Sequence, residues 1–148
     1  MQNTAHHINI LLVEDNPGDA RLAQEGIKEL GFQHTLSIVD DGLKAINYLH
    51  RQGEFENVSQ PDLILLDLNL PKKSGKEVLA EIKEDIHLRT IPVVVLSTSK
   101  SEKDISEVYN LHGNCYITKP VDFEEFVNVV KTINNFWFNL VKLPKENN

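Results

Sequence analysis

The sequence is poor in cysteine and has no long apolar run. One of its 148 residues is a cysteine, so the chain cannot form an internal disulfide, which fits a reducing compartment. Its longest apolar runs are only a few residues, whereas a transmembrane helix needs about 20. The first residues lack the basic and apolar regions of a signal peptide. We therefore expect a soluble, cytoplasmic protein.

Positive charge is also scarce. The chain has 15 Lys and Arg against 22 Asp and Glu, a formal net charge of −7. This balance opposes binding to a nucleic-acid backbone, which needs a basic surface, and binding to an anionic membrane. The sequence also lacks a Gly-x-x-x-x-Gly-Lys-Ser/Thr loop and a Gly-x-Gly-x-x-Gly turn. Their absence disfavours P-loop nucleotide hydrolysis and dinucleotide binding.

Five short apolar segments alternate with five amphipathic segments. The predicted strands are residues 8–13, 35–39, 63–66, 93–96 and 114–118. The predicted helices are residues 17–30, 42–49, a segment around 78–82, 101–111 and 122–140. Strands that alternate with helices form a parallel sheet covered on both faces. The sequence therefore predicts one α/β domain over residues 1–148, with a doubly wound sheet, a core of about 8–140 and a polar tail at 143–148.

Capping residues indicate where the helices begin and end. Asn16 is a favourable N-cap, and Pro17 suits the first helical position. Gly31 is expected to end that helix. The pattern Ser-x-x-Asp at Ser101 and Asp104 predicts a capping box at the start of the fourth helix.

Polar side chains follow four of the predicted strands. Glu14 and Asp15 follow the first, Asp67 ends the third, Ser97 ends the fourth, and Lys119 follows the fifth. The carboxyl ends of parallel strands meet at one edge of the sheet, where ligands bind in such folds. A pair of carboxylates 4 Å apart repels by about 4 kcal/mol at an effective dielectric of about 20, so either their pKa values rise or a cation binds. Oxygen ligands suit Mg²⁺, and an acidic pocket with a divalent cation and an ammonium suits a phosphoryl group.

Two points stay open at this level. Any one acid at a strand end could simply cap the following helix, although a set at four strand ends argues against that reading. The hydroxyl that faces a bound phosphoryl group could come from Ser97, Thr98 or Ser99.

These motifs, in this order, resemble the receiver domain of two-component response regulators. The resemblance covers about residues 8–140 and is carried by Val13–Pro17, Asp67–Pro71 with Gly75, Ser97 and Tyr116–Pro120. It implies a flavodoxin-like fold, a doubly wound five-stranded parallel sheet in the order 2-1-3-4-5 with five helices. It also implies a phosphoprotein that a sensor histidine kinase modifies.

The resemblance implies a role for each site residue. Asp67 would accept the phosphoryl group, and Ser97 and Lys119 would contact it. The Mg²⁺ ligands would be Glu14, Asp15, Asp67 and the backbone carbonyl of Asn69. The Glu14-Asp15 pair replaces the commoner Asp-Asp pair, and serine at 97 stands where threonine is also common; both keep the chemistry.

Two further positions match switch residues of the family. Pro120 would form a cis peptide that aims the preceding lysine side chain. Tyr116 matches the aromatic position whose ring turns inward when the hydroxyl at Ser97 moves toward the phosphoryl group.

A more specific resemblance points to a subgroup. Asn16–Leu22, the long loop before the third strand, Asn114–Lys119 and the segment Phe136–Phe138 followed by Leu143-Pro144 are similar to the single-domain response regulators of bacterial and cyanobacterial phytochromes. This similarity implies that the partner kinase is a phytochrome, a red-light sensor, and that the chain has no output domain of its own.

The predicted helix 122–140 has more apolar residues than one buried stripe requires. The stripe expected to face the sheet is Phe123, Phe126, Val127, Val130, Ile133 and Trp137, and the surplus is Val129, Phe136, Phe138, Leu140 and Val141. A helix on a sheet normally buries one stripe, so the surplus predicts a homodimer or partner surface. The alternative is that the chain end folds back over these residues.

Three functions compete at this stage. The first is a phosphorylation-driven signalling switch that is not an enzyme beyond its own phosphotransfer and autodephosphorylation. The second is a small Mg²⁺-dependent phosphohydrolase with an aspartate nucleophile, but the chain offers no substrate-binding cap. The third is a scaffold that is never phosphorylated, which would not need Glu14, Asp15, Asp67 and Lys119 together.

Overall fold

The computed structural model describes residues 7–29, 31, 33–113, 115–119, 124–125, 128 and 131–132. Some sequence predictions fall outside these residues. They concern Pro120 and the apolar residues of the last helix, including Val129, Phe136, Phe138 and Leu140. Of the predicted helix 122–140, the described residues 124–125, 128 and 131–132 are helical and exposed.

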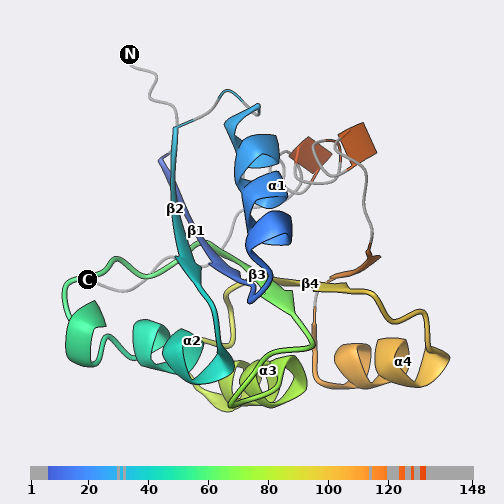
Figure 1. The fold of residues 1–148 in the computed structure, drawn as a ribbon. Helices are drawn as coiled ribbons and strands as arrows, with labels where there is room; N and C mark the ends of the chain where they lie inside the picture. The colour runs from blue at the N-terminus through green and yellow to red at the C-terminus, as the bar shows by residue number, and fades with distance from the viewer. Residues whose placement is uncertain are drawn as a thin grey trace.

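The elements form a parallel sheet between two layers of helices (Figure 1). In chain order they are β1 (Ile8–Val13), α1 (Pro17–Lys28), β2 (His34–Val39), α2 (Gly42–Leu49), the 3-10 turn η1 (Gly53–Phe55), β3 (Leu63–Asp67), α3 (Gly75–Glu84), β4 (Val93–Ser97), α4 (Glu102–Asn110) and β5 (Cys115–Thr118). The strand order is β2-β1-β3-β4-β5, with every pair parallel. The predicted doubly wound fold and strand order are therefore confirmed. Of the five predicted helices, four are bounded within the described residues as α1 to α4.

The two sides of the sheet bury separate apolar clusters. Leu11 and Val13 of β1 belong to one cluster, and Ile10 and Leu12 belong to the other. This division follows from the two-residue period of a strand, which sends successive side chains to opposite faces. In Figure 1, α1 covers one face, and α2, α3 and α4 cover the other. Because helices cover both faces, the inner strands are mostly apolar, and Asp67 and Ser97 stand at the carboxyl ends of β3 and β4.

Hydrogen bonds of capping side chains explain most helix starts. The predicted capping box at the start of α4 needs correction, and so does the end of the first helix. The first helix ends at Lys28, two residues before the predicted end. A full capping box forms between Ser74 and Glu77 at the start of α3. At α4 only half of the predicted box exists: Ser101 Oγ accepts the Asp104 amide at 3.3 Å, while the Asp104 carboxylate accepts the Ser99 hydroxyl at 2.5 Å. The Asp104 carboxylate also accepts from Lys76 Nζ at 2.6 Å, so these two partners take the place of the Ser101 amide.

Candidate functional site

Three carboxylates meet at the carboxyl edge of the sheet. One oxygen each from Glu14, Asp15 and Asp67 lies within 4.8 Å of the others. Strand pairing brings them together, because Val13 of β1 pairs with Leu66 of β3 and the acids follow directly. Glu14 and Asp67 are buried, and Asp15 is exposed. Within the described part of the chain, no other set of three such side chains gathers in this way.

Lys119 places an ammonium group among these acids. Its backbone amide donates to the Ser97 carbonyl at 2.6 Å, which fixes the residue beside the end of β4. Its Nζ donates to Glu14 Oε1, to Asp19 Oδ2 at 3.0 Å and to Asp67 Oδ2 at 3.4 Å. An ammonium has three donor hydrogens, so these three acceptors account for all of them.

Burial and charge shift the pKa values of two groups in this cluster. Burial, together with the neighbouring Asp67 carboxylate, raises the pKa of Glu14 to about 7, and Lys119 opposes that rise. Burial alone would lower the pKa of the Lys119 ammonium, but hydrogen bonds to Glu14 and Asp19 and the nearby negative charges raise it overall. Lys119 is therefore a permanent positive charge at this edge.

The β3–α3 loop orients Asp67. The amide of Asn69 donates to Asp67 Oδ1 at 3.1 Å, so each carboxylate oxygen has a partner, the other being Lys119. The amide of Gly75 donates to the Leu68 carbonyl at 2.9 Å and folds α3 back against the end of β3. A Cβ atom at Gly75 would lie 2.2 Å from the Asp67 carbonyl oxygen. Glycine is therefore required for this close approach.

Hydrogen bonds to Ser99 connect the predicted phosphate-contacting hydroxyl with the predicted switch residue. Ser97 is fully buried, and its Oγ accepts the Ser99 amide at 3.1 Å. Tyr116 is partly buried, and its hydroxyl donates to the Ser99 carbonyl at 2.8 Å. Thr98 is exposed. Ser99 therefore links the predicted phosphate-contacting serine to the predicted switch tyrosine.

Three ion pairs of the site region are absent from the sequence prediction. Asp19 binds Lys119 across a separation of 100 residues. Lys76 of α3 binds Asp104 of α4 at 2.6 Å and Glu107 at 3.3 Å. The position of Asp19 in the first turn of a helix that follows a strand end is the signal that could have indicated the first contact.

The donor set suits a divalent cation that prefers oxygen. It offers three carboxylates, two of them buried, and no cysteine or histidine among the three. Such hard oxygen donors match Mg²⁺ and Mn²⁺ rather than metals that prefer sulfur or imidazole ligands. Burial, and after it the neighbouring Asp67 carboxylate, raises the pKa of Glu14, and a bound cation would offset both the burial and the repulsion of these negative charges.

The fold and this acidic edge define the chain as a receiver domain, and comparison with known proteins agrees. The sequence model of the response regulator receiver domain matches residues 10–131, and the chain belongs to this family. It is 53% identical over 135 residues to the response regulator Rcp1 of Synechocystis sp., covering 91% of this chain and 92% of Rcp1.

Solved structures give the same result. The phosphorylated cyanobacterial phytochrome response regulator RcpA superposes with a TM-score of 0.86 at 53% identity, covering 95% of this chain and 100% of that one. The Mn²⁺-bound form of Rcp1 gives a TM-score of 0.83 at 51% identity, with 93% and 99% covered. The chain is thus a receiver response regulator, homologous to phytochrome response regulators, that signals through phosphorylation.

Three general properties come with the family. Receiver domains are signalling proteins, they bind divalent cations, and they interact with histidine kinases. No helix among the described residues is long and apolar enough to cross a membrane.

Proposed function

We propose that Asp67 is the phosphoryl acceptor of this response regulator. One observation carries the proposal: the buried Asp67 carboxylate lies 3.4 Å from the Lys119 ammonium and within 4.8 Å of carboxylate oxygens of Glu14 and Asp15. An acceptor needs a carboxylate held in place, a fixed positive charge for the incoming phosphoryl oxygens and a site for a cation. These residues supply all three at one sheet edge.

The proposed transfer is a displacement at phosphorus. A carboxylate oxygen of Asp67 forms a bond to the phosphorus of a phosphohistidine on the kinase as the phosphorus–nitrogen bond breaks. The imidazole nitrogen keeps the electron pair of that bond and takes a proton from solvent. Lys119 pairs with a phosphoryl oxygen and offsets its negative charge. The result is an aspartyl phosphate on this chain and a free histidine on the kinase.

A divalent cation, Mg²⁺ in our proposal, would be held by Glu14, Asp15, Asp67 and the backbone carbonyl of Asn69. When bound, it would supply positive charge to the phosphoryl oxygens. The support for this assignment is the chemistry of the donor set and the Mn²⁺-bound form of the relative Rcp1.

The proposed switch follows from the hydrogen bonds of Ser99. The Ser97 Oγ accepts the Ser99 amide and keeps its own hydrogen as a donor for a phosphoryl oxygen on Asp67. We propose that movement of Ser97 toward that phosphoryl group shifts Ser99 through this bond. Movement of Ser99 would in turn disturb its bond with the Tyr116 hydroxyl. Tyr116 is therefore proposed as the aromatic switch residue, and Pro120, outside the described residues, as the residue that aims Lys119.

We further propose a phytochrome as the partner kinase, with the chain acting as one receiver domain over residues 1–148 in red-light signalling. The support is the similarity to RcpA, a cyanobacterial phytochrome response regulator, of which this chain covers 100%. A homodimer through the last helix, including Val129, Phe136, Phe138 and Leu140, remains a proposal based on their surplus of apolar side chains.

The test is the intact mass of the protein after incubation with a small phosphoryl donor, with and without Mg²⁺. We expect a Mg²⁺-dependent gain of one phosphoryl group in the wild type and no gain in Asp67→Asn. Retained modification in Asp67→Asn would move the acceptor to another residue. An unmodified wild type that binds Mg²⁺ and also receives nothing from phosphorylated phytochrome would favour the scaffold function.

A further inference from the structure

Lys119 is held by three carboxylates, and they differ in one respect. Glu14 and Asp67 belong to the acidic set proposed to bind a cation, whereas Asp19 does not. Asp19 lies in the first turn of α1, its side chain is 44% exposed, and its Oδ2 is 3.0 Å from Lys119 Nζ. Of the three carboxylates that contact Lys119, Asp19 is the one that is not a proposed ligand of the cation.

The local structure of α1 holds Asp19 in this place. Asn16 Oδ1 accepts the backbone amide of Asp19 at 3.0 Å as the N-cap bond of the helix. The capping bond uses the backbone, so the carboxylate is free to reach Lys119. The same helix start therefore brings the Asp19 side chain to the edge of the acidic cluster.

A cation and the Lys119 ammonium compete for the same oxygens. Both carry positive charge, and both interact with the buried carboxylates of Glu14 and Asp67. Nζ already donates to one oxygen of each of these two carboxylates, and its third hydrogen bond goes to Asp19. If that third bond also moved onto Glu14 or Asp67, the affinity for a cation would fall. A carboxylate to one side, bonded to the ammonium, neutralises it and limits that movement.

We infer that Asp19 is a positioning residue, which holds the Lys119 ammonium beside the oxygens of Glu14 and Asp67 and so keeps them available to the divalent cation. This inference rests on the cation site proposed above. It assigns a role in the site to a residue of α1 that is not among the carboxylates of the candidate cation set.

A double-mutant cycle separates positioning from simple charge. The dissociation constant for Mn²⁺ would be measured, from the electron paramagnetic resonance signal of free Mn²⁺, for the wild type, Asp19→Asn, Lys119→Met and the double variant. If Lys119 does not move when Asp19 is replaced, loss of the Asp19 charge weakens Mn²⁺ binding by the same factor in the wild-type and the Lys119→Met backgrounds. If Lys119 moves when Asp19 is lost, the factor is larger when Lys119 is present.

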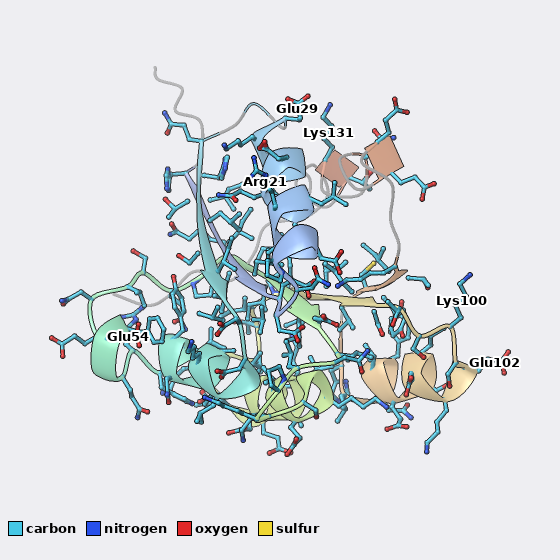
Figure 2. All side chains as sticks on the ribbon, viewed as in Figure 1. Arg21, Glu29, Glu54, Lys100, Glu102 and Lys131 are labelled. Atoms are coloured by element: carbon cyan, nitrogen blue, oxygen red, sulfur yellow. The ribbon has the colours of Figure 1, made fainter. Side chains whose placement is uncertain are left out.

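We expect that factor to be about five-fold larger when Lys119 is present, which matches the upper range for solvent-exposed ion pairs. Equal factors in the two backgrounds would overturn the inference. Glu102→Gln is the matched control, because Glu102 also stands in the first turn of a helix and its side chain points away from the domain in Figure 2. Glu102→Gln should leave the Mn²⁺ affinity unchanged. Asp19→Glu keeps the carboxylate and should retain most of the Mn²⁺ affinity that Asp19→Asn loses.

A second measurement does not depend on Lys119→Met folding well. The Nζ resonance of Lys119 would be recorded by NMR in the metal-free wild type and in Asp19→Asn. We expect a shifted resonance and faster exchange of its protons with solvent in the variant, and an unchanged signal would overturn the inference. A wild type that binds Mn²⁺ but gains no phosphoryl group would overturn the acceptor proposal alone, because the cycle uses unphosphorylated protein.

Discussion

Replacement of Lys119 by methionine should destabilise the metal-free protein strongly. The change keeps most of the apolar stem and removes the charge that faces Glu14, Asp19 and Asp67. At 3.4 Å and an effective dielectric of about 20, the attraction to Asp67 alone amounts to about 5 kcal/mol before desolvation is subtracted. Removing one partner of a buried ion pair costs about 3–5 kcal/mol, so we expect a loss of about 3 kcal/mol.

Addition of Mg²⁺ should recover much of this loss, because the cation gives the stranded carboxylates a new positive partner. The assay is urea denaturation of the wild type and Lys119→Met at pH 7.5, with a chelator or with Mg²⁺ at equal ionic strength, followed by circular dichroism. A penalty below 1 kcal/mol in chelator, or one that is unchanged by Mg²⁺, would refute the electrostatic account of this edge.

Lys28→Met serves as the control for that experiment. Lys28 also forms an ion pair, with Glu25 at 3.7 Å, but the two side chains are 64% and 46% exposed. Surface pairs of this kind contribute roughly 0–1 kcal/mol. The free energy of unfolding of Lys28→Met should therefore lie within about 0.5 kcal/mol of the wild-type value, with or without Mg²⁺.

Two more predictions concern the scaffold around the site. Gly75→Ala should destabilise the protein by about 2 kcal/mol or more, because the new Cβ would overlap the backbone of Asp67; a wild-type urea midpoint would contradict this explanation. The ion pair between Lys76 and Asp104 joins two helices with side chains 30% and 28% exposed, so a cycle of Lys76→Met and Asp104→Asn should give a coupling free energy of about 1 kcal/mol. Strictly additive losses would mean that the pair does not link α3 to α4.

The elements of the fold could be predicted because their signals are local. A run of β-branched and leucine residues specifies a buried strand wherever it lies, and Asn16 caps a helix through an amide three residues away. The order of the sheet followed from the resemblance and not from such signals. The candidate acids could also be predicted, since Glu14, Asp15 and Asp67 follow strands that had to end at one edge.

The half-formed capping box of α4 marks the limit of local reasoning. Ser101 and Asp104 have the right spacing, and Ser101 does accept the Asp104 amide. The Asp104 carboxylate, however, lies near the Ser99 hydroxyl and the Lys76 ammonium, and it binds those groups. A charged partner offers a stronger hydrogen bond than a backbone amide, and spacing alone could not indicate it.

The order of residues along the chain is enough to predict which acids and which lysine belong to the site, and that they share one edge of the sheet. That order does not predict which of them share hydrogen bonds, because Asp19 and Lys119 are 100 residues apart and meet only when α1 and β5 lie on the finished sheet. The pKa of Glu14 likewise depends on burial that no neighbour in sequence supplies. Residue types and strand ends therefore determined the chemistry available, and tertiary packing decided the partners and the charge states.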